Sequence, residues 1–298
     1  MINAVIIYLS RKQSINDLKK SLKLLNKNFT RRFKYPVLIF NDDFTNADQR
    51  ILRKIYSNIK FEKIKFEIPL WIDKNQIDKG SHKVRLGYMH MCRFFSGEIY
   101  KHEAIKNYDW YWRLDSDSYL HYRIRYDIFN FMEKQGFIYG CFETNIKEKP
   151  EFVIGLWELT KEYIQKNNFQ PIFLNKYLDK EGKWDRSVFY TNFEISKLDF
   201  WRSERYKEYY DMIDQNGGIY YYRWGDATIH LLALSMLVGE AKIHYFKDID
   251  YSHQEFRPNR KIPFLKRVIV SRINFFSQTI KYIRNKIVTY IRMVKKKF

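Results

Sequence analysis

The stretch TNFEISKLDFWRSERYKEYYDMIDQNGGIYYYRWGDATIHLLAL, residues 191–234, places two carboxylates in distinctive surroundings. Glu194 follows the amide of Asn192 in an aromatic setting, and Asp226 stands between a Trp-Gly pair and a helix-like apolar run. One predicted helix separates them along the chain, so only the fold can bring them together. Two carboxylates that meet are typical of enzymes acting at a sugar's anomeric carbon, where positive charge develops in the transition state.

Upstream of this stretch, short apolar runs alternate with segments of helical period. The order strand, helix, strand, helix, strand indicates an α/β fold with a parallel sheet. In such sheets nucleotides bind where the strands end. The predicted strands are Ala4–Leu9, Tyr35–Phe40 and Phe61–Ile68, and the predicted helices are Ile15–Phe29, with Ser14 as its N-cap, and Ala47–Ile55.

Polar side chains follow the predicted strands. Arg11 and Asn41 lie at the ends of the first two, and another apolar run, Trp110–Leu114, ends at Asp115 and Asp117. Hard cations prefer oxygen ligands, and nucleotide phosphates supply the ligands that the protein does not. The carboxylate pair therefore predicts a divalent-cation site against a diphosphate. A solvated surface turn is the alternative for this pair.

Two further segments complete the predicted body of the protein. Ala227–Leu237 is a helix candidate, and Asp226 lies at its start, where helix capping is the structural alternative to a catalytic role. His230, one turn later, is interpreted as structural. A last strand is predicted at Ile243–Phe246, and His253 follows it.

Several ordered blocks give the chain a family resemblance. Asn192-Phe193-Glu194-Ile195, Leu198-Asp199-Phe200, Gly217-Gly218 and Arg223-Trp224-Gly225-Asp226 resemble the signature of the fungal α-1,2-mannosyltransferases, glycosyltransferase family 15. The likeness spans roughly residues 3–256 and implies a GT-A-like nucleotide-sugar transferase fold, an α/β fold with a mixed central sheet flanked by helices. The outer blocks are YMHMCRFFSG (88–97), YDWYWRLDSD (108–117), YDIFNFMEKQGFIYG (126–140) and IHYFKDIDYSH (243–253).

The resemblance implies a reaction as well as a fold. It implies transfer of mannose from GDP-mannose to a hydroxyl, the 2-OH of mannose, with retention of configuration and with Mn²⁺ or another divalent cation. Glu194 matches the family's proposed nucleophile, and Tyr88 matches an active-site tyrosine. Asp226 is the second candidate carboxylate, holding sugar hydroxyls or acting as a base.

The resemblance also assigns the donor and metal sites. Arg11 matches an arginine that contacts the nucleotide, and the histidine matching His253 ligates manganese, for which neutral imidazole is suited. Asp117 is assigned to the metal with His253. The remaining donor-binding candidates are Asn41, Arg93 and Asp115. The metal and nearby arginines would stabilise the departing GDP.

Charge and cysteine content restrict partners and location. Of the net charge of +20, thirteen Lys/Arg without any acid lie in 257–298, which leaves +7 on 1–256. A nucleic-acid-binding protein would carry its basic stripe on the folded body, so no nucleic-acid partner is expected. Two cysteines build no disulfide framework, and neither a signal peptide nor a membrane-spanning run is seen. The predicted location is the cytoplasm or the cytoplasmic face of a membrane.

Residues 257–298 are predicted to form a basic amphipathic helical tail beside a catalytic domain of 1–256. The tail suits an anionic membrane surface. Packing on the domain or on a partner is the main alternative, and nucleic acid is a third. The apolar residues that recur at three- and four-residue steps are Leu265, Ile269, Ile273, Phe276, Ile280, Ile283, Ile287, Ile291 and Val294.

Three interpretations of function remain open. The first is the mannosyltransferase, whose partners would be a nucleotide sugar and a glycan acceptor. The second keeps the framework but uses another nucleotide sugar or acceptor. The third is an inactive transferase-like adaptor that binds a membrane or a glycan. The presence of all the candidate carboxylates together with His253 favours an enzyme, because a binding module has no need for the whole set.

Overall fold

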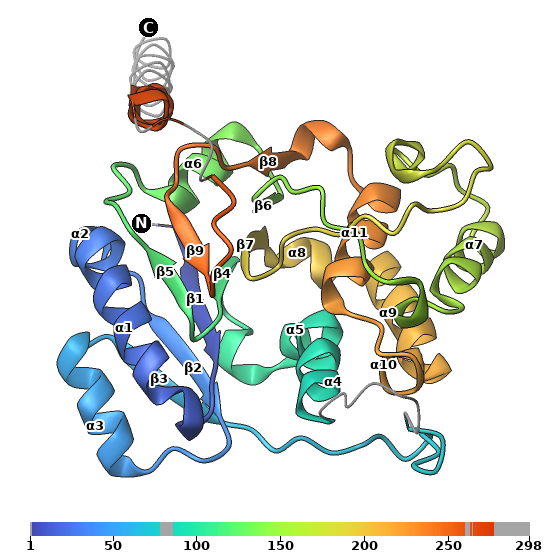
Figure 1. Cartoon of the computed structure of the whole chain (residues 1–298), viewed down its shortest axis with the longest axis horizontal. Helices are drawn as coiled ribbons and strands as arrows, with labels where there is room; N and C mark the ends of the chain where they lie inside the picture. The colour runs from blue at the N-terminus through green and yellow to red at the C-terminus, as the bar shows by residue number, and fades with distance from the viewer. Residues whose placement is uncertain (1, 78–85, 260–262, 264, 277–298) are drawn as a thin grey trace, which may run out of the picture.

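A mixed sheet of seven strands forms the centre of the protein, which we describe from a computed structural model covering residues 2–77, 86–259, 263 and 265–276 (Figure 1). The strand order is β3-β2-β1-β4-β7-β6-β8, and β5 and β9 form a separate two-stranded ribbon. The strands are β1 (Ala4–Leu9), β2 (Val37–Asn41), β3 (Ile59–Lys63), β4 (Trp110–Leu114), β5 (Ser118–Leu120), β6 (Tyr139–Cys141), β7 (Phe193–Lys197), β8 (Ile243–Tyr245) and β9 (Tyr251–His253).

The direction of β7 positions the candidate site. Strands β1 to β4 run parallel to one another, whereas β7 is antiparallel to both β4 and β6. The start of β7 therefore lies at the edge where β1, β2 and β4 end. In this register Arg113 of β4 faces Glu194 of β7 as its cross-strand partner.

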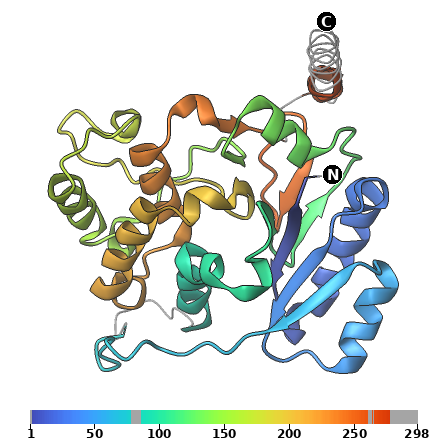
Figure 2. The ribbon, with the colours of Figure 1, turned by 180° about the vertical axis from the view of Figure 1, so that it is seen from behind.

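Two groups of helices cover the two faces of the sheet (Figures 1 and 2). Side chains alternate along each strand, so Trp112 of β4 packs in one core and Tyr111 in the other. The first core lies under α1 (Ile15–Leu25), α2 (Arg31–Phe33), α3 (Asn46–Ile55) and α6 (Ile128–Gln135). The second lies under α4 (Leu86–Arg93), α5 (Ile99–Lys101), α7 (Leu156–Lys166), α8 (Leu198–Trp201), α9 (Glu204–Asn216), α10 (Gly218–Tyr221) and α11 (Asp226–Leu237).

The structure confirms several predicted elements with their bounds. The strands Ala4–Leu9 and Trp110–Leu114 are β1 and β4. Helix α11 begins one residue earlier than expected, so Asp226 is its first residue and Gly225 its N-cap. Ser14 is the N-cap residue of α1 as predicted, but its side chain makes no capping hydrogen bond, because a 3₁₀ turn runs directly into the helix.

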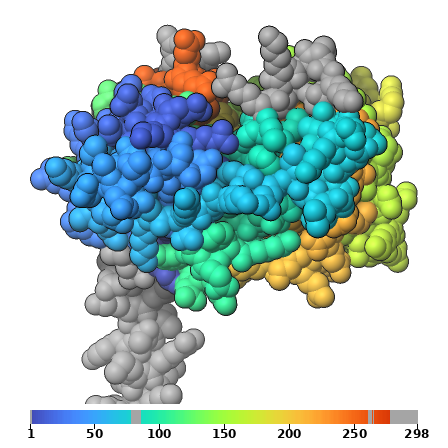
Figure 3. All heavy atoms as spheres, turned by 90° about the horizontal axis from the view of Figure 1, so that it is seen from below, coloured from blue at the N-terminus to red at the C-terminus, as the bar shows by residue number. Residues whose placement is uncertain are grey.

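The third predicted strand is wrong over residues 64–68. Strand β3 ends at Lys63, and the chain then crosses the lower face of the molecule toward α10, as the cyan segment of Figure 3 shows. Trp71 Nε1 donates to the carbonyl of Asp214 at 2.9 Å, and the backbone N–H of Asp73 donates to the Tyr221 hydroxyl at 2.9 Å. Strand β2, the partner of β3, ends at Asn41 opposite Lys63, so residues 64–68 have no strand to pair with despite their alternating apolar pattern.

Of the predicted tail, residues 265–276 are helical, whereas residues 257–259 at its start are not. The rest of the predicted apolar stripe, from Ile280 onward, lies outside the described residues. The boundary between 256 and 257 stays a prediction. Within the described ranges, no helix is both long enough and apolar enough to pass through a bilayer.

Candidate active site

The position of Asp226, at the start of α11, depends on an indole ring that packs tightly against a glycine. A Cβ on Gly218 would come within 2.3 Å of the Trp224 ring, so only glycine lets this indole lie flat on the chain. Trp224 Nε1 donates to the carbonyl of Ile154 at 2.9 Å, which fixes the ring. Arg223 takes a left-handed φ of 64° just before it. The tight turn therefore places the side chain of Asp226 in the interior of the protein.

A buried arginine links Asp226 to the sheet. Arg113 is 1% exposed, and its Nη1 donates to Asp226 Oδ2 while its Nε lies 3.4 Å from Asp115 Oδ1. Its guanidinium also covers the ring of Phe95, 3.6 Å from the centroid. Burial disfavours ionisation of Asp226, but Arg113, His230 and a hydrogen bond from Thr191 outweigh it and lower the pKa of this carboxyl. Asp226 is therefore a carboxylate.

Glu194 is fully buried at 0% exposure, and its carboxyl group contacts three polar side chains. The Tyr111 hydroxyl donates to Oε1 at 2.8 Å, and the Tyr139 hydroxyl donates to Oε2 at 2.9 Å. His230 Nδ1 lies 3.0 Å from Oε2, and its Nε2 lies 3.1 Å from the carbonyl oxygen of Phe95. His230 thus has a structural role as predicted, but the group it orients is the candidate nucleophile.

Tyr88 lies against the turn that carries Asp226. A Cβ on Gly225 would stand 3.7 Å from the Tyr88 hydroxyl, and the Arg223 guanidinium lies 4.5 Å from the ring centroid. The neighbouring Cys92, burial and the charge of Asp226 raise the pKa of Tyr88. This partly exposed side chain is therefore a neutral phenol that can donate a hydrogen bond.

Asp117, Asp115 and His253 meet where β4 and β9 end. His253 Nε2 is 3.1 Å from Asp117 Oδ1 and 3.5 Å from Asp115 Oδ2. Burial disfavours the charges of both partners, yet their pairing lowers the pKa of Asp117 and raises that of His253. Asn192 Nδ2 donates to Asp115 Oδ2. All three titratable side chains are partly exposed, so this end of the site opens to solvent.

These residues fit a divalent cation that phosphate oxygens also bind. Adjacent ligands of an octahedral ion lie roughly 3 Å apart, close to the separation of Asp117 Oδ1 and His253 Nε2. Carboxylate and imidazole together suit manganese. Within the described part of the chain, no group of three or more His, Cys, Asp or Glu side chains forms a complete metal site. The pair would therefore need ligands from the substrate.

Arg11 and Asn41 lie at the same edge of the sheet, but their side chains differ in how firmly the protein holds them. Arg11 is well exposed, 3.7 Å from Asp42, and packs over Gly87, where a Cβ would come within 2.7 Å of its guanidinium. Asn41 is buried, and its amide bonds the backbone of Ile39, Glu62 and Phe44. Arg11 can reach a ligand, whereas the Asn41 side chain holds the loop.

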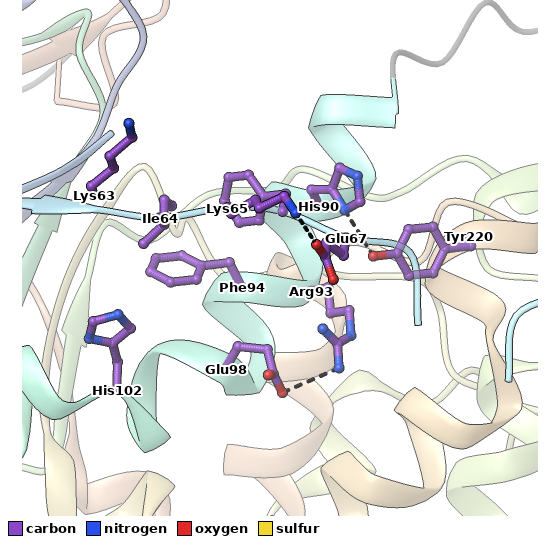
Figure 4. Close-up of a pocket in the computed structure, with 11 residues that line it drawn as sticks. Lys63, Ile64, Lys65, Glu67, His90, Arg93, Phe94, Glu98, His102 and Tyr220 are labelled. Atoms are coloured by element: carbon purple, nitrogen blue, oxygen red, sulfur yellow. Dashed lines mark hydrogen bonds and ion pairs between the residues drawn. The ribbon is translucent and has the colours of Figure 1, made fainter. Parts of the chain in front are cut away.

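Arg93 lines a separate cavity of about 280 Å³ (Figure 4). Its guanidinium makes a bidentate ion pair with Asp214 at 2.7 and 2.8 Å and lies 3.5 Å from Glu98. Neither of the two candidate carboxylates nor the Asp117–His253 pair lines this cavity. The predicted donor-binding role of Arg93 stays a prediction. Besides Arg93, the polar residues that line the cavity are Lys63, Lys65, Glu67, His90, Glu98, His102 and Tyr220.

Sequence reasoning missed Arg113, the residue that connects the two ends of the site. The sequence did indicate this role. If the apolar run WYWRL is a buried strand, the charge of its single arginine has to be paired with a carboxylate. Asn192 was noticed only as a neighbour of Glu194. Its contact with Asp115 depends on strand order, which no local pattern shows.

The sequence matches the family described as "Glycolipid 2-alpha-mannosyltransferase" over residues 1–283. The chain belongs to this family. Glycolipid 2-alpha-mannosyltransferase 2 of Candida albicans is 35% identical over 274 residues, covering 86% of this chain and 59% of the relative. The probable mannosyltransferase KTR3 of Saccharomyces cerevisiae is 35% identical, covering 85% of this chain and 67% of the relative. This member of the family thus spans about three fifths to two thirds of these relatives' lengths.

Two solved structures confirm the predicted GT-A-like fold of this family member. Core-mannan synthase A of Aspergillus fumigatus, in an Mn/GDP form, superposes with a TM-score of 0.81 at 31% identity and covers 87% of this chain and 76% of its own. The mannosyltransferase Ktr4p of S. cerevisiae, in complex with GDP, also has a TM-score of 0.81, at 29% identity, over 86% of this chain and 72% of its own.

Proposed function

We propose that this chain is a metal-dependent retaining mannosyltransferase that transfers mannose from GDP-mannose to the 2-OH of a mannose acceptor. The observation that carries the proposal is the unbroken series of charged contacts from the Asp117–His253 pair through Asp115 and Arg113 to Asp226. Family membership supports the reaction. The Mn/GDP and GDP forms of the two solved relatives support the donor and the cation.

The solvent-exposed end would hold the diphosphate. Asp117 and His253 would bind a divalent cation, which would stabilise negative charge on the departing diphosphate. Asn192 fixes the carboxylate of Asp115 beside them. Arg11 lies at the neighbouring strand end, exposed enough to contact the nucleotide.

The buried end would act on the sugar. Tyr88 donates a hydrogen bond toward the donor, and Asp226 remains ionised behind it because Arg113 compensates its charge. Glu194 has no exposed surface, and its carboxyl oxygens contact the side chains of Tyr111, Tyr139 and His230. In this arrangement it supports the developing positive charge electrostatically. Direct attack would require its carboxylate to leave the hydroxyls of Tyr111 and Tyr139.

A transfer assay tests the proposal. The full chain is incubated with GDP-mannose, MnCl₂ and methyl α-mannoside, and the product is analysed by NMR for linkage and anomeric configuration. We expect an α-1,2-linked product, and we expect EDTA to abolish it. A β-linked product would contradict retention, and another linkage would contradict the 2-OH acceptor.

Binding measurements separate the remaining alternatives. In calorimetry, His253→Ala should weaken the binding of Mn²⁺ and GDP without abolishing folding, whereas Lys207→Ala on the exposed surface of α9 should not. Turnover of a different nucleotide sugar in place of GDP-mannose would select the second interpretation. Binding of a glycan without turnover of any donor would select the adaptor.

A further inference from the structure

The helix of residues 265–276 is attached to the body by its polar side. Arg267 Nη1 lies 3.1 Å from Asp250 Oδ2, and Asn274 Nδ2 donates to Asp248 Oδ2 at 3.4 Å. Ser271 between them is buried. The polar side of this amphipathic helix thus faces the protein.

Its apolar side is consequently turned to solvent. Leu265 is 69% exposed, Ile269 50%, Ile273 59% and Phe276 56%. An amphipathic helix on a globular protein ordinarily buries this stripe against the core. A continuous exposed apolar surface of this kind marks an interaction site.

Four arginines gather beside the exposed stripe. Together with Phe275 and Phe276 they line a cavity of about 410 Å³. Within the described residues none of the four guanidinium groups forms an ion pair with a carboxylate, and all four residues are exposed. One of them, Arg32, donates to the carbonyl of Arg125 at 2.8 Å. The four are Arg32, Arg123, Arg125 and Arg272.

We propose that this basic–apolar patch, formed by the four arginines with Leu265, Ile269, Ile273, Phe275 and Phe276, binds the surface of an anionic phospholipid bilayer. Lipid phosphates match uncompensated guanidinium groups, and the adjoining acyl boundary takes up the exposed stripe. Nucleic acid would satisfy the arginines but leave the stripe in water. A bilayer is the partner that accepts both parts of the patch.

The patch lies away from the candidate active site. In Figures 1 and 2 the red helix stands at the upper edge of the molecule, whereas α4, which carries Tyr88, and α10 lie toward the opposite edge. A bilayer bound at the patch would therefore leave the active site open to soluble substrates. The proposal does not depend on the activity proposed above.

Flotation of the full chain with vesicles tests the inference. Vesicles of phosphatidylcholine alone are compared with vesicles that also contain phosphatidylserine. We expect the protein to float only with the anionic vesicles. The triple variant Arg123→Gln/Arg125→Gln/Arg272→Gln should lower the partition coefficient on the order of 100-fold, since each basic residue near such a surface contributes about fivefold. Arg32 is left in place because its side chain bonds the backbone.

A matched control separates the effect of the patch on vesicle binding from the effect of the overall net charge. The variant Lys166→Gln/Lys180→Gln/Lys207→Gln removes the same charge from exposed positions elsewhere, and residues 277–298 are unchanged in both. It should float like the unaltered protein. Ile273→Ser/Phe276→Ser should also reduce flotation, with circular dichroism showing that the fold is intact.

Several results would overturn the inference. These are equal flotation with neutral vesicles, equal losses in the arginine and lysine variants, or full binding by the Ile273→Ser/Phe276→Ser protein. A dimer in solution that this serine variant converts to a monomer would assign the stripe to a second copy. Binding of DNA, lost in the arginine variant and without any vesicle binding, would assign the patch to nucleic acid.

Discussion

The guanidinium of Arg113 and the carboxylate of Asp226 form a buried ion pair that joins the middle of the sheet to the first residue of α11. Arg113 lies in β4, and Asp226 lies more than a hundred residues later along the chain. This pair, rather than a direct contact between carboxylates, connects the solvent-exposed end of the candidate site, at Asp117 and His253, to its buried end.

Replacing Arg113 by methionine should destabilise the protein strongly. Methionine keeps much of the volume but leaves the buried carboxylate of Asp226 without a compensating charge. We expect a loss of about 3–5 kcal/mol in the free energy of unfolding, measured by urea denaturation. In the double variant Arg113→Met/Asp226→Asn part of that loss should be recovered. A single variant as stable as the unaltered protein would show that the pair does not compensate buried charge.

Glu194→Gln should impair transfer while the protein still folds. The amide nitrogen of glutamine would face a hydroxyl or imidazole donor, so one hydrogen bond of the buried cluster is lost at a cost of about 1–3 kcal/mol. We expect a fall in mannosyl transfer on the order of 100-fold, as for the loss of one preorganised electrostatic group. Tyr139→Phe, which removes a single donor to Glu194, should cost less activity. Transfer close to the original rate by Glu194→Gln would remove Glu194 from the mechanism.

Asp248 should make the stability depend on pH. Burial raises the pKa of this carboxyl from 3.8 to about 6 in the folded protein. The folded state therefore holds the proton more tightly than the unfolded state. The stabilisation that this produces is complete below about pH 4 and is lost as the pH rises through about 6, a change of roughly 3 kcal/mol.

The variant Asp248→Asn removes this dependence. It should unfold at higher urea concentration than the unaltered protein at about pH 7.5 and lose that advantage toward about pH 4. Asp250→Asn is the contrasting variant, because Asp250 pairs with Arg257 and Arg267 and its loss should destabilise the protein. A constant difference between the Asp248→Asn variant and the unaltered protein at both pH values would contradict the assignment.

His244→Phe should stabilise the fold. His244 Nε2 is buried with no hydrogen-bond partner among the described residues, and the ring contacts Phe131, Phe137 and Phe246. Burial, followed by the charge of Lys247, lowers the pKa of His244 to about 4. Removing the unpaired nitrogen should add about 1 kcal/mol, seen as a higher melting temperature. His244→Gln keeps a polar group and should not stabilise; a lower melting temperature for the phenylalanine variant would mean that the ring does not fit.

Local patterns were sufficient for the elements that hold the site. The apolar runs Ala4–Leu9 and Trp110–Leu114 predicted β1 and β4 because strands buried on both faces need continuous apolar sequence. The residues that follow them, Arg11 and Asp115, could be placed at one edge by the same argument. The pattern failed at residues 64–68, because the neighbouring strand β2 ends at Asn41 and leaves this segment without a strand to pair with.

The connections within the site could not be predicted in this way. The contact of Asn192 with Asp115 arises because β7 enters the sheet antiparallel to β4. The cluster around Glu194 likewise draws its donors from β4, β6 and α11. Such contacts depend on strand order and register, which residue spacing along a single segment does not specify.

The length of β7 consequently restricts how this protein can change. Inserting or deleting one residue in the strand would exchange its two faces. The carboxylate of Glu194 would then turn toward the aromatic core around Trp112 and Phe193, and an isoleucine or phenylalanine would meet His230. We therefore expect a one-residue insertion in β7 to be far more damaging than a similar insertion in a surface loop.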